Sequence, residues 1–272
     1  MPLEQTGPAW LFCPADRPER FEKAAATADV VILDLEDGVA LADKEEARAA
    51  LINTPLDPAR TVVRVNASNT ADQERDLQTL ARTAYTTVML PKCEAEYQVA
   101  ALAPLEVVVL IESPMGALTV AESVRADNAI GVMWGAEDLF AAFGGTSNRN
   151  ADGTYRDVAR QVRSQTLLAA KAYRRMALDS VYLDIRDLEG LRAEVDDAVA
   201  VGFDAKVAIH PSQVAVIRAG YAPTAEQVDW ARHVLAAARD QRGVFAFGGI
   251  MVDAPVLRRA ERILQLAPDS GP

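Results

Sequence analysis

Short apolar runs alternate with longer amphipathic segments along the 272 residues of the chain. The runs are rich in β-branched residues, and most of them are continuously apolar, which is typical of strands buried on both faces of a parallel sheet. We predict eight strands on this basis. They cover residues 10–14, 30–35, 62–66, 87–91, 107–112, 129–134, 180–184 and 205–209.

The segments between the predicted strands have helical periodicity, and several begin with acidic residues, which favour the positive end of the helix dipole. These helical segments include residues 17–27, 43–52, 72–82, 157–176 and 187–201. Eight strands that alternate with helices in a chain of this length predict a (β/α)8 TIM barrel. A doubly wound open sheet follows from the same alternation and is the alternative fold.

Helical sequence continues beyond the eighth predicted strand, at residues 224–241 and 256–266. We therefore expect a catalytic barrel domain at residues 1–222 and a C-terminal helical extension at residues 223–272. One connection inside the barrel, residues 140–155, is long, polar and rich in glycine. Loops of this length in compact domains are often functional, so the segment is either a lid or thioester-binding loop, or a plain surface loop.

Composition narrows the class of protein. The chain carries 28 basic and 39 acidic residues, a net charge of −11, and has no basic stripe, which argues against a nucleic-acid partner. Cys13 and Cys93 lie far apart outside any CxxC motif, so we expect reduced, structural thiols. No apolar run reaches membrane-spanning length, and residues 1–9 lack the features of a signal peptide. These features predict a cytoplasmic protein without a membrane partner.

Polar side chains follow the predicted strands at the points where the strands end. In a TIM barrel these ends and the loops after them form the active site. Carboxylates that face one cavity repel each other unless a cation lies between them. The polar residues at these strand ends are Asp34, Glu36, Asp37, Arg64, Asn66, Lys92, Glu112, Glu137 and Asp138.

Glu112 and Asp138 are the candidate metal ligands, because they follow neighbouring strands and can converge. Ligation by oxygen alone through one or two carboxylates suits Mg²⁺. Zinc is disfavoured, because His210 and His233 are the only histidines and no cluster of His and Cys exists. The alternative is that the two carboxylates pair with Lys or Arg in a buried network.

Two cations and one histidine complete the candidate set. Arg64 can grip a substrate carboxylate with its planar fork, or it can simply neutralise Glu36 or Asp37. Lys92 can form a Schiff base, contact a thioester or carboxylate, or pair with an acidic group; a metal ion that serves as the electron sink disfavours the Schiff base. His210 ends the eighth predicted strand and is either functional or structural.

Seven segments in this order resemble the citrate lyase β-subunit (CitE-like) group of the HpcH/HpaI aldolase superfamily, whose near relatives include the malyl-CoA and citramalyl-CoA lyases. The resemblance covers nearly the whole chain. The segments are LDLEDGV at 33–39, VRVN at 63–66, LPK at 90–92, IESPMG at 111–116, GAEDL at 135–139, AIHP at 208–211 and MVDAP at 251–255.

The resemblance implies a TIM barrel, Mg²⁺ on Glu112 and Asp138, and Arg64 on the substrate carboxylate. It implies that Glu36 and Asp37 hold the waters of the metal. An aspartate in the C-terminal extension of CoA-dependent relatives acts as general acid/base in a neighbouring subunit's site, and Asp253 matches it, so a homotrimer or hexamer is expected. We also expect Lys92, Ala136 and His210 to contact the substrate.

The implied reaction is Mg²⁺-dependent cleavage of a carbon–carbon bond in a 3-hydroxyacyl thioester of citryl, citramalyl or malyl type. The products are a 2-oxo acid such as oxaloacetate and a short acyl thioester, carried on CoA or on an acyl carrier protein. One alternative is a pyruvate aldolase of the HpcH/HpaI type, which uses an early histidine; no histidine precedes His210. The other is a catalytically silent, carrier-binding subunit.

Overall fold

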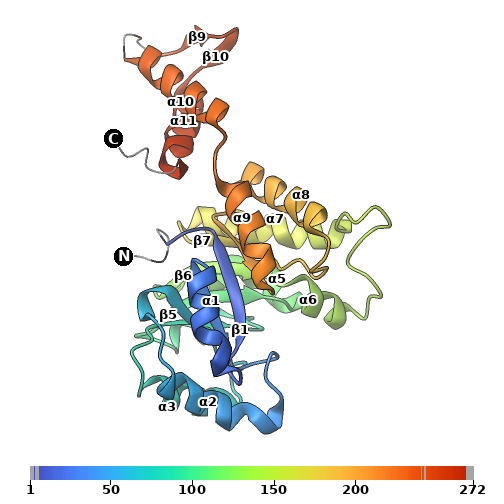
Figure 1. Cartoon of the computed structure of the whole chain (residues 1–272). Helices are drawn as coiled ribbons and strands as arrows, with labels where there is room; N and C mark the ends of the chain where they lie inside the picture. Colours follow the sequence, from blue (N-terminus) through green and yellow to red (C-terminus); the bar gives the residue numbers. More distant parts are fainter. Residues whose placement is uncertain (1–2, 4–5, 240, 242, 268–272) are drawn as a thin grey trace. The chain divides into compact units, whose positions relative to one another are not determined.

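A computed structural model describes residues 3, 6–239, 241 and 243–267. Eight parallel strands close into a barrel in chain order, with β1 beside β8, so the predicted TIM barrel is confirmed (Figure 1). The strands are β1 (Ala9–Pro14), β2 (Val30–Asp34), β3 (Thr61–Arg64), β4 (Thr87–Leu90), β5 (Glu106–Ile111), β6 (Ala129–Trp134), β7 (Met176–Asp179) and β8 (Ala205–Ala208).

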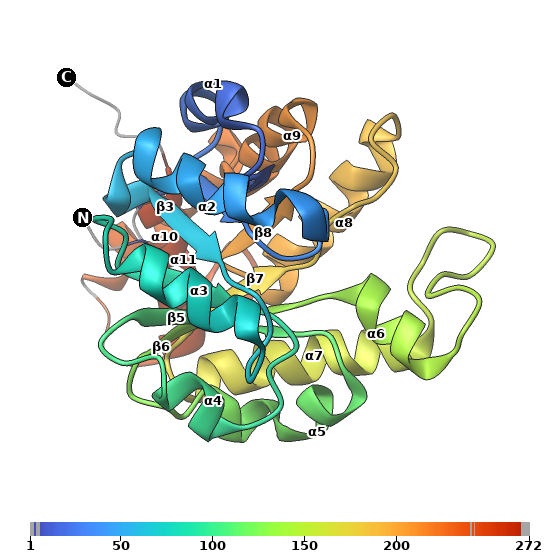
Figure 2. The same ribbon diagram turned by 90° about the horizontal axis from the view of Figure 1, so that it is seen from below.

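Helices surround the strands, as the view in Figure 2 shows. They are α1 (Phe21–Thr27), α2 (Lys44–Asn53), α3 (Ala71–Leu80), α4 (Glu96–Ala100), α5 (Pro114–Ser123), α6 (Ala136–Phe143), α7 (Asp157–Ala172), α8 (Leu188–Val201) and α9 (Pro211–Tyr221). Short 3-10 turns lie at Pro18–Arg20, Leu41–Asp43 and Pro58–Arg60. The chain divides into two compact units, residues 1–217 and residues from 218 onward, and the division falls within α9.

The barrel interior is filled by alternate residues of the strands. Val30 and Ile32 of β2, and Val108 and Leu110 of β5, belong to one buried apolar cluster. Successive side chains of a strand point to opposite faces, so the residue two positions further on in each strand faces the same way. This parity directs Asp34 and Glu112 to the inner face at the carboxyl end of the barrel.

The seventh strand lies earlier than predicted: it is β7, Met176–Asp179, and not residues 180–184. Helix α7 ends at Ala172, and Arg174 has a positive φ of 55°, which stops the helix before the expected end at residue 176. The prediction extended the helix over the strand. It was also wrong to treat the whole of 140–155 as loop, because α6 continues to Phe143 and ends on left-handed Gly144.

A buried polar network joins the strands to the outer helices. The Lys206 ammonium is fully buried and lies 3.2 Å from both Asp179 Oδ2 and Glu194 Oε2. Asp179 also accepts hydrogen bonds from Trp134 Nε1 at 2.8 Å and Arg163 Nε at 2.9 Å. Charges in such a position are tolerated because each has several partners. The network therefore fixes β6, β7 and β8 against α7 and α8.

The second unit contains α10 (Ala225–Ala238), β9 (Phe245–Phe247), β10 (Ile250–Val252) and α11 (Ala254–Leu266). It has its own small core, in which Val234, Val252 and Ala260 are fully buried. The strands form an antiparallel hairpin that the sequence pattern did not reveal. Its turn is Gly248-Gly249, and both residues have positive φ, as a two-residue hairpin turn of type I′ requires.

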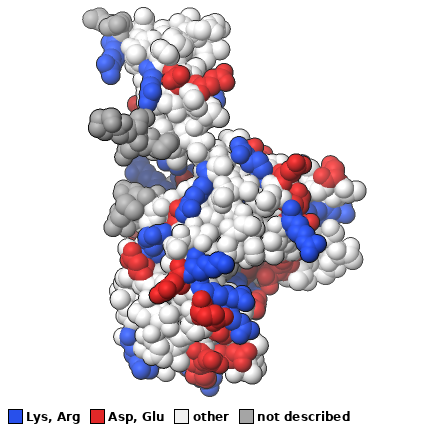
Figure 3. Space-filling view, viewed as in Figure 1, with Lys and Arg blue, Asp and Glu red and all other residues white. Residues whose placement is uncertain are grey.

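No helix in the described parts of the chain is both long and apolar enough to cross a bilayer. Cys13 and Cys93 are buried and free. On the face shown in Figure 3, basic and acidic side chains are interspersed rather than gathered into patches of one sign.

The Asp179 network predicts a specific acid sensitivity. Burial opposes ionisation of Asp179, but Lys206 and Arg163 outweigh it and lower the pKa to about 2. A carboxyl group with a depressed folded-state pKa contributes stability above its ordinary pKa, and this contribution is lost as the pH falls from about 4 to 2. We expect Asp179→Asn to destabilise the protein at pH 7 by about 3 kcal/mol, and about 2 kcal/mol of that difference to vanish by pH 2.

Chemical unfolding of both proteins from pH 7 to pH 2 measures the effect. Asp157→Asn is the matched control, because Asp157 is an exposed aspartate on α7. A stability difference between wild type and Asp179→Asn that does not change with pH contradicts the prediction.

Candidate active site

Asp34 organises the acidic turn that follows β2. It is the last residue of that strand, and it is buried. Its two carboxylate oxygens accept hydrogen bonds from the backbone N–H groups of Glu36 and Gly38, each at 2.9 Å. A Cβ atom at Gly38 would lie 2.2 Å from Asp34 Oδ2, so this turn needs glycine. Asp34 therefore sets the path of the chain through Glu36 and Asp37.

Arg64, the last residue of β3, forms ion pairs with two acids of this turn. Its Nε lies 2.7 Å from Asp34 Oδ1 and its Nη2 lies 2.5 Å from Asp34 Oδ2, which is a bidentate pair. Its Nη1 lies 3.1 Å from Glu36 Oε2, and the guanidinium covers the ring of Phe12. Burial opposes the charge, but the Asp34 carboxylate outweighs it and raises the pKa of Arg64. Arg64 is thus a fixed cation whose acidic partners are Asp34 and Glu36.

Lys92, two residues after β4, links the acidic turn to the next strands. Its ammonium pairs with Glu36, lies 2.8 Å from Asp37 Oδ2, and lies 3.8 Å from Asp138 Oδ1. Its backbone is left-handed, with a φ of 50°, and its N–H donates to Glu112 Oε1 at 2.9 Å. A non-glycine residue in this region is strained, and such strain gathers at functional sites.

These contacts bear on the chemistry of Lys92. Burial opposes its charge, but hydrogen bonds to Asp37 and Glu36 outweigh it and raise the pKa of Lys92. A lysine that forms a Schiff base needs a depressed pKa, so that the free amine is available. The geometry therefore favours the reading in which Lys92 pairs with acidic groups.

Glu112, directly after β5, is the buried carboxylate without a paired cation. It is 3% exposed, and no Lys or Arg among the described residues lies within ion-pair distance of it. Gly135 lies against it, since a Cβ there would be 3.0 Å from Glu112 Oε2. Burial first, and then the charge of Asp138, raise the pKa of Glu112 to about 8. Asp138 is in the first turn of α6, which begins at the end of β6.

This arrangement fits Mg²⁺. A buried carboxylate that a second carboxylate repels is stabilised by a divalent cation between them. Mg²⁺ binds through one or two carboxylates and keeps several waters. Two carboxylates, Glu112 and Asp138, leave the other coordination positions to water. Within the described residues, no group of three or more His, Cys, Asp or Glu side chains is arranged to hold a metal alone. A Mg²⁺ ion held by Glu112 and Asp138 would take its other ligands from water and substrate oxygens.

Glu36 and Asp37 respond differently to the same cations. Burial raises the pKa of Glu36 and outweighs the opposing charges of Arg64 and Lys92. Burial also opposes ionisation of Asp37, but its hydrogen bond with Lys92 outweighs that effect and lowers the pKa. Asp37 is the more exposed of the two, with a side chain that is 59% accessible. The turn therefore offers one buried and one exposed carboxylate.

Three predicted residues remain: Ala136, His210 and Asp253. Ala136, two residues before Asp138, is buried. Its N–H donates to Ser180 Oγ at 3.4 Å. His210 is exposed at the start of α9, where its Nδ1 accepts a hydrogen bond from the Ser212 N–H at 3.2 Å. Asp253 belongs to the second unit, where it caps α11 and lines a cavity of about 450 Å³.

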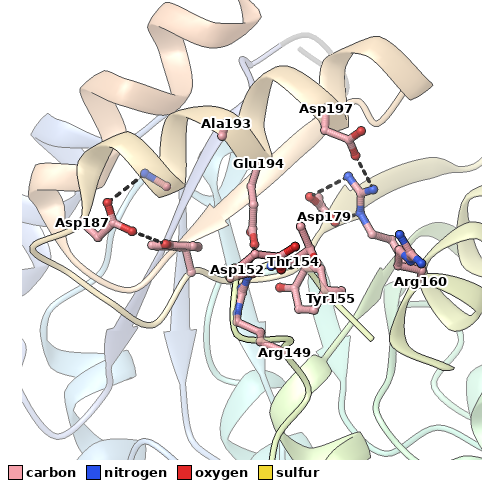
Figure 4. Close-up of a pocket in the computed structure, with 14 residues that line it drawn as sticks. Arg149, Asp152, Thr154, Tyr155, Arg160, Asp179, Asp187, Ala193, Glu194 and Asp197 are labelled. Atoms are coloured by element: carbon pink, nitrogen blue, oxygen red, sulfur yellow. Dashed lines mark hydrogen bonds and ion pairs between the residues drawn. The ribbon is translucent and has the colours of Figure 1, made fainter. Parts of the chain in front are cut away.

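The loop after α6 is anchored to the barrel by two adjacent residues, Asn148 and Arg149. Asn148 Nδ2 donates to Glu137 Oε1 at 2.6 Å, which ties the loop to the first turn of α6. Arg149 Nη1 lies 2.5 Å from Glu194 Oε1 of α8, and its guanidinium covers the ring of Tyr155. Arg149, Tyr155 and Glu194 line a cavity of about 400 Å³, and Figure 4 shows them among its lining residues.

The charged groups around this cavity are largely paired with one another. Besides Arg149 and Glu194, Arg163 pairs with Asp179 and Asp197. Such mutual pairing is typical of a structural anchor, and nothing in the lining selects a ligand class. Whether the loop acts as a lid or binds a thioester stays a prediction.

A closed eight-stranded barrel with carboxylates clustered at its carboxyl end defines a metal-dependent TIM-barrel type of site. The chain belongs to the HpcH/HpaI aldolase/citrate lyase family, whose model matches residues 9–211. The family expected from the sequence motifs is confirmed.

Three known proteins illustrate the relationship. The chain is 63% identical to a citrate lyase subunit beta-like protein of Mycobacterium tuberculosis, over 99% of each chain. It is 31% identical to the human mitochondrial citramalyl-CoA lyase, over 95% of this chain and 85% of that protein. The crystal structure of M. tuberculosis CitE in complex with magnesium, acetoacetate and coenzyme A superimposes with a TM-score of 0.94 at 64% identity, covering 97% of this chain and 99% of that one.

The buried Glu112 predicts a stability cost in the absence of metal. Its folded-state pKa of about 8 lies above the ordinary value of 4.5, so the cost grows as the pH rises from 4.5 and is complete above pH 8. In EDTA at pH 9, we expect Glu112→Gln to be more stable than wild type by about 2–5 kcal/mol. This advantage should disappear near pH 4, where wild-type Glu112 is protonated.

Chemical unfolding in EDTA at both pH values measures the difference. Glu106→Gln is the control, because Glu106 is an exposed glutamate at the start of the same strand. Saturating Mg²⁺ should reverse the order, because only wild type keeps the anionic ligand. A Glu112→Gln protein that is less stable than wild type in EDTA at pH 9 contradicts the prediction.

Proposed function

We propose that the protein is a Mg²⁺-dependent lyase that cleaves a carbon–carbon bond in a 3-hydroxyacyl thioester, giving a 2-oxo acid and a short acyl thioester. The observation that carries the proposal is the buried Glu112 carboxylate, which faces the charge of Asp138 without a paired cation. The magnesium in the 64% identical M. tuberculosis structure supports the same assignment.

The substrate is a CoA thioester of citramalyl, malyl or citryl type. The M. tuberculosis structure contains coenzyme A together with acetoacetate, and the human relative is a citramalyl-CoA lyase. Both support CoA over an acyl carrier protein. Two buried free cysteines support a reducing compartment, and we place the protein in the cytoplasm.

We assign Glu112 and Asp138 to hold Mg²⁺, and Glu36 and Asp37 to hold its waters. When bound, the ion supplies positive charge that favours the deprotonated hydroxyl and the oxo-acid product. We assign Arg64, whose orientation Asp34 fixes, to bind the substrate carboxylate through the N–H groups that Asp34 and Glu36 leave over. Lys92 keeps the acidic turn neutralised, and Ala136 and His210 line the approach of the substrate.

One proton moves during cleavage, from the substrate hydroxyl to the carbon that becomes the acyl methyl or methylene group. One of the two carboxylates, Glu36 or Asp37, accepts the hydroxyl proton, and the electron pair of the broken bond passes to the thioester enolate. Asp253 from a neighbouring subunit, in its protonated form, gives its proton to the enolate carbon, or removes that proton in the synthetic direction. The proton held by Glu36 or Asp37 then returns through solvent to Asp253. The net reaction therefore needs no external oxidant or reductant.

The second unit supports a role between subunits. Its hairpin exposes apolar side chains, with Ile250 47% and Met251 66% accessible. Apolar groups in such numbers at a tip are typical of a surface that another chain covers. We propose that the unit from residue 223 onward docks on a neighbouring copy in a homotrimer or hexamer, and brings Asp253 to its site.

Turnover of purified protein on citramalyl-CoA, malyl-CoA and citryl-CoA tests the reaction. We expect cleavage that requires Mg²⁺, stops in EDTA, and falls at least about 100-fold in Glu112→Ala and in Asp138→Asn, because each removes a metal ligand. Glu106→Gln should keep wild-type activity. Cleavage that continues in EDTA, or no cleavage of any of the three thioesters, contradicts the proposal.

Mixing two inactive variants tests the role of Asp253. Glu112→Ala and Asp253→Ala should each be inactive alone. If the aspartate acts across the interface, co-refolded oligomers with equal amounts of both chains recover about one quarter of wild-type activity. Half of the barrels keep Glu112, and half of those receive an intact Asp253 from their neighbour in a closed ring. An inactive mixture shows that Asp253 does not act in a neighbouring site.

A further inference from the structure

Lys44 is a buried ammonium next to the acidic turn. It is the first residue of α2 and is 9% exposed. Its Nζ donates to Leu35 O at 2.7 Å, to Glu36 O at 3.0 Å and to Asn66 Oδ1 at 2.8 Å. An ammonium has three donors, so each of them has found an oxygen. None of these acceptors is a carboxylate, which sets Lys44 apart from Arg64 and Lys92.

These oxygens belong to the chain segments that carry the site. Leu35 and Glu36 form the start of the acidic turn, and Asn66 follows Arg64 by two residues. Lys44 therefore joins the ends of β2 and β3 from the outer side. A buried cation costs free energy unless its donors are satisfied, so the three oxygens must stay in place around it.

A second layer holds Asn66 in turn. Asp76 of α3 accepts hydrogen bonds from Asn66 N at 2.8 Å and from Asn66 Nδ2 at 2.7 Å. Arg48 of α2 donates to Asp76 Oδ1 at 2.8 Å and pairs with Asp72. Helices α2 and α3 lie side by side in both views (Figures 1 and 2). The network thus connects two helices with the backbone of Glu36.

The amide groups of the turn depend on the same geometry. The N–H groups of Glu36 and Gly38 bond to Asp34, and the Asp37 N–H donates to Glu36 Oε2 at 3.0 Å. If the carbonyls of Leu35 and Glu36 shift, the side chain of Glu36 moves relative to Arg64 and Lys92. The position of one carboxylate thus depends on a cation that lies behind it.

We propose that Lys44 is a positioning residue, whose ammonium holds the Leu35–Asp37 turn so that Glu36 and Asp37 face the metal and the substrate. The inference rests on the proposed function only for its effect on turnover. Its effects on the turn and on metal affinity are separate and can be measured without a substrate.

Lys44→Met is the variant that tests it. Leu35 O still accepts from Asn66 Nδ2, and Glu36 O from the Val39 N–H, so the fold keeps a partner for each carbonyl. We expect amide hydrogen exchange in residues 34–40 to be at least about 10-fold faster, with residues 176–182 unchanged. Mutation of residues that support the ligands of a metal site typically lowers metal affinity by about 10- to 100-fold. We therefore expect Mg²⁺ binding, measured by calorimetry, to weaken about 10-fold.

Turnover provides the third readout. We expect kcat to fall about 10- to 100-fold while KM changes less than about threefold, because the turn acts on the reacting groups more than on CoA. Lys23→Met on α1 is the control, since Lys23 is exposed, and it should match wild type throughout. If the wild-type protein is inactive, the proposed function is wrong. Amide hydrogen exchange and Mg²⁺ binding then still test the positioning role of Lys44.

A folded Lys44→Met protein with wild-type exchange in residues 34–40 and wild-type Mg²⁺ affinity overturns the proposal. If Lys44→Met does not fold, Lys44→Gln takes its place, because it retains two N–H donors without the charge. The proposal then expects faster exchange and weaker Mg²⁺ binding than in wild type, and wild-type values of both overturn it.

Discussion

Several carboxylates share one end of the barrel, and their mutual repulsion has to be offset where little water reaches them. Arg64 offsets the charge on β2 by binding Asp34 with both arms of its fork. Lys92 does the same for Glu36 and Asp37. Both cations are engaged with other acids, so within the described residues Glu112 has no ion pair, and its Oε1 accepts only the Lys92 N–H at 2.9 Å. The Mg²⁺ proposed for this site would supply the positive charge that the paired cations do not give to Glu112.

Buried charges are stabilised in two different ways outside the acidic cluster. Behind the strands, Asp179 and Lys206 satisfy each other and join the barrel to its helices. Behind the acidic turn, Lys44 binds backbone oxygens, so its charge is not cancelled by a carboxylate. The first arrangement fixes structure, whereas the second holds in place groups that still have to bind something else. Rigid support of this kind is what a precise site requires.

Much of the fold and part of the site follow from sequence pattern. Glu112 could be predicted at the mouth of the barrel because it directly follows an apolar strand. The structure adds that Leu110, two residues earlier, belongs to the inner core, which explains why Glu112 faces inward. The motif spacing pointed to Asp138 as well. The seventh strand was misplaced because its four residues, Met176–Asp179, are too short to separate from the helix before them.

Other features depend on contacts that no local pattern encodes. Lys44 reads as an ordinary helix-start lysine, and only the tertiary structure brings Asn66 and the Leu35 carbonyl around it. The bidentate hold of Asp34 on Arg64 joins residues thirty positions apart. The β9–β10 hairpin rests on two glycines in a tail that otherwise reads as helical.

Asp179 and Glu112 show what separates a structural carboxylate from a functional one. Both are almost fully buried, at 1% and 3% exposure, and both end or follow a barrel strand. Cations lower the pKa of the first to about 2, while burial and a second carboxylate raise that of the second to about 8. A fold selected for stability alone would have paired Glu112 or replaced it. In the function proposed above, a ligand that binds Glu112 recovers that free energy, so binding and stability are coupled at this position.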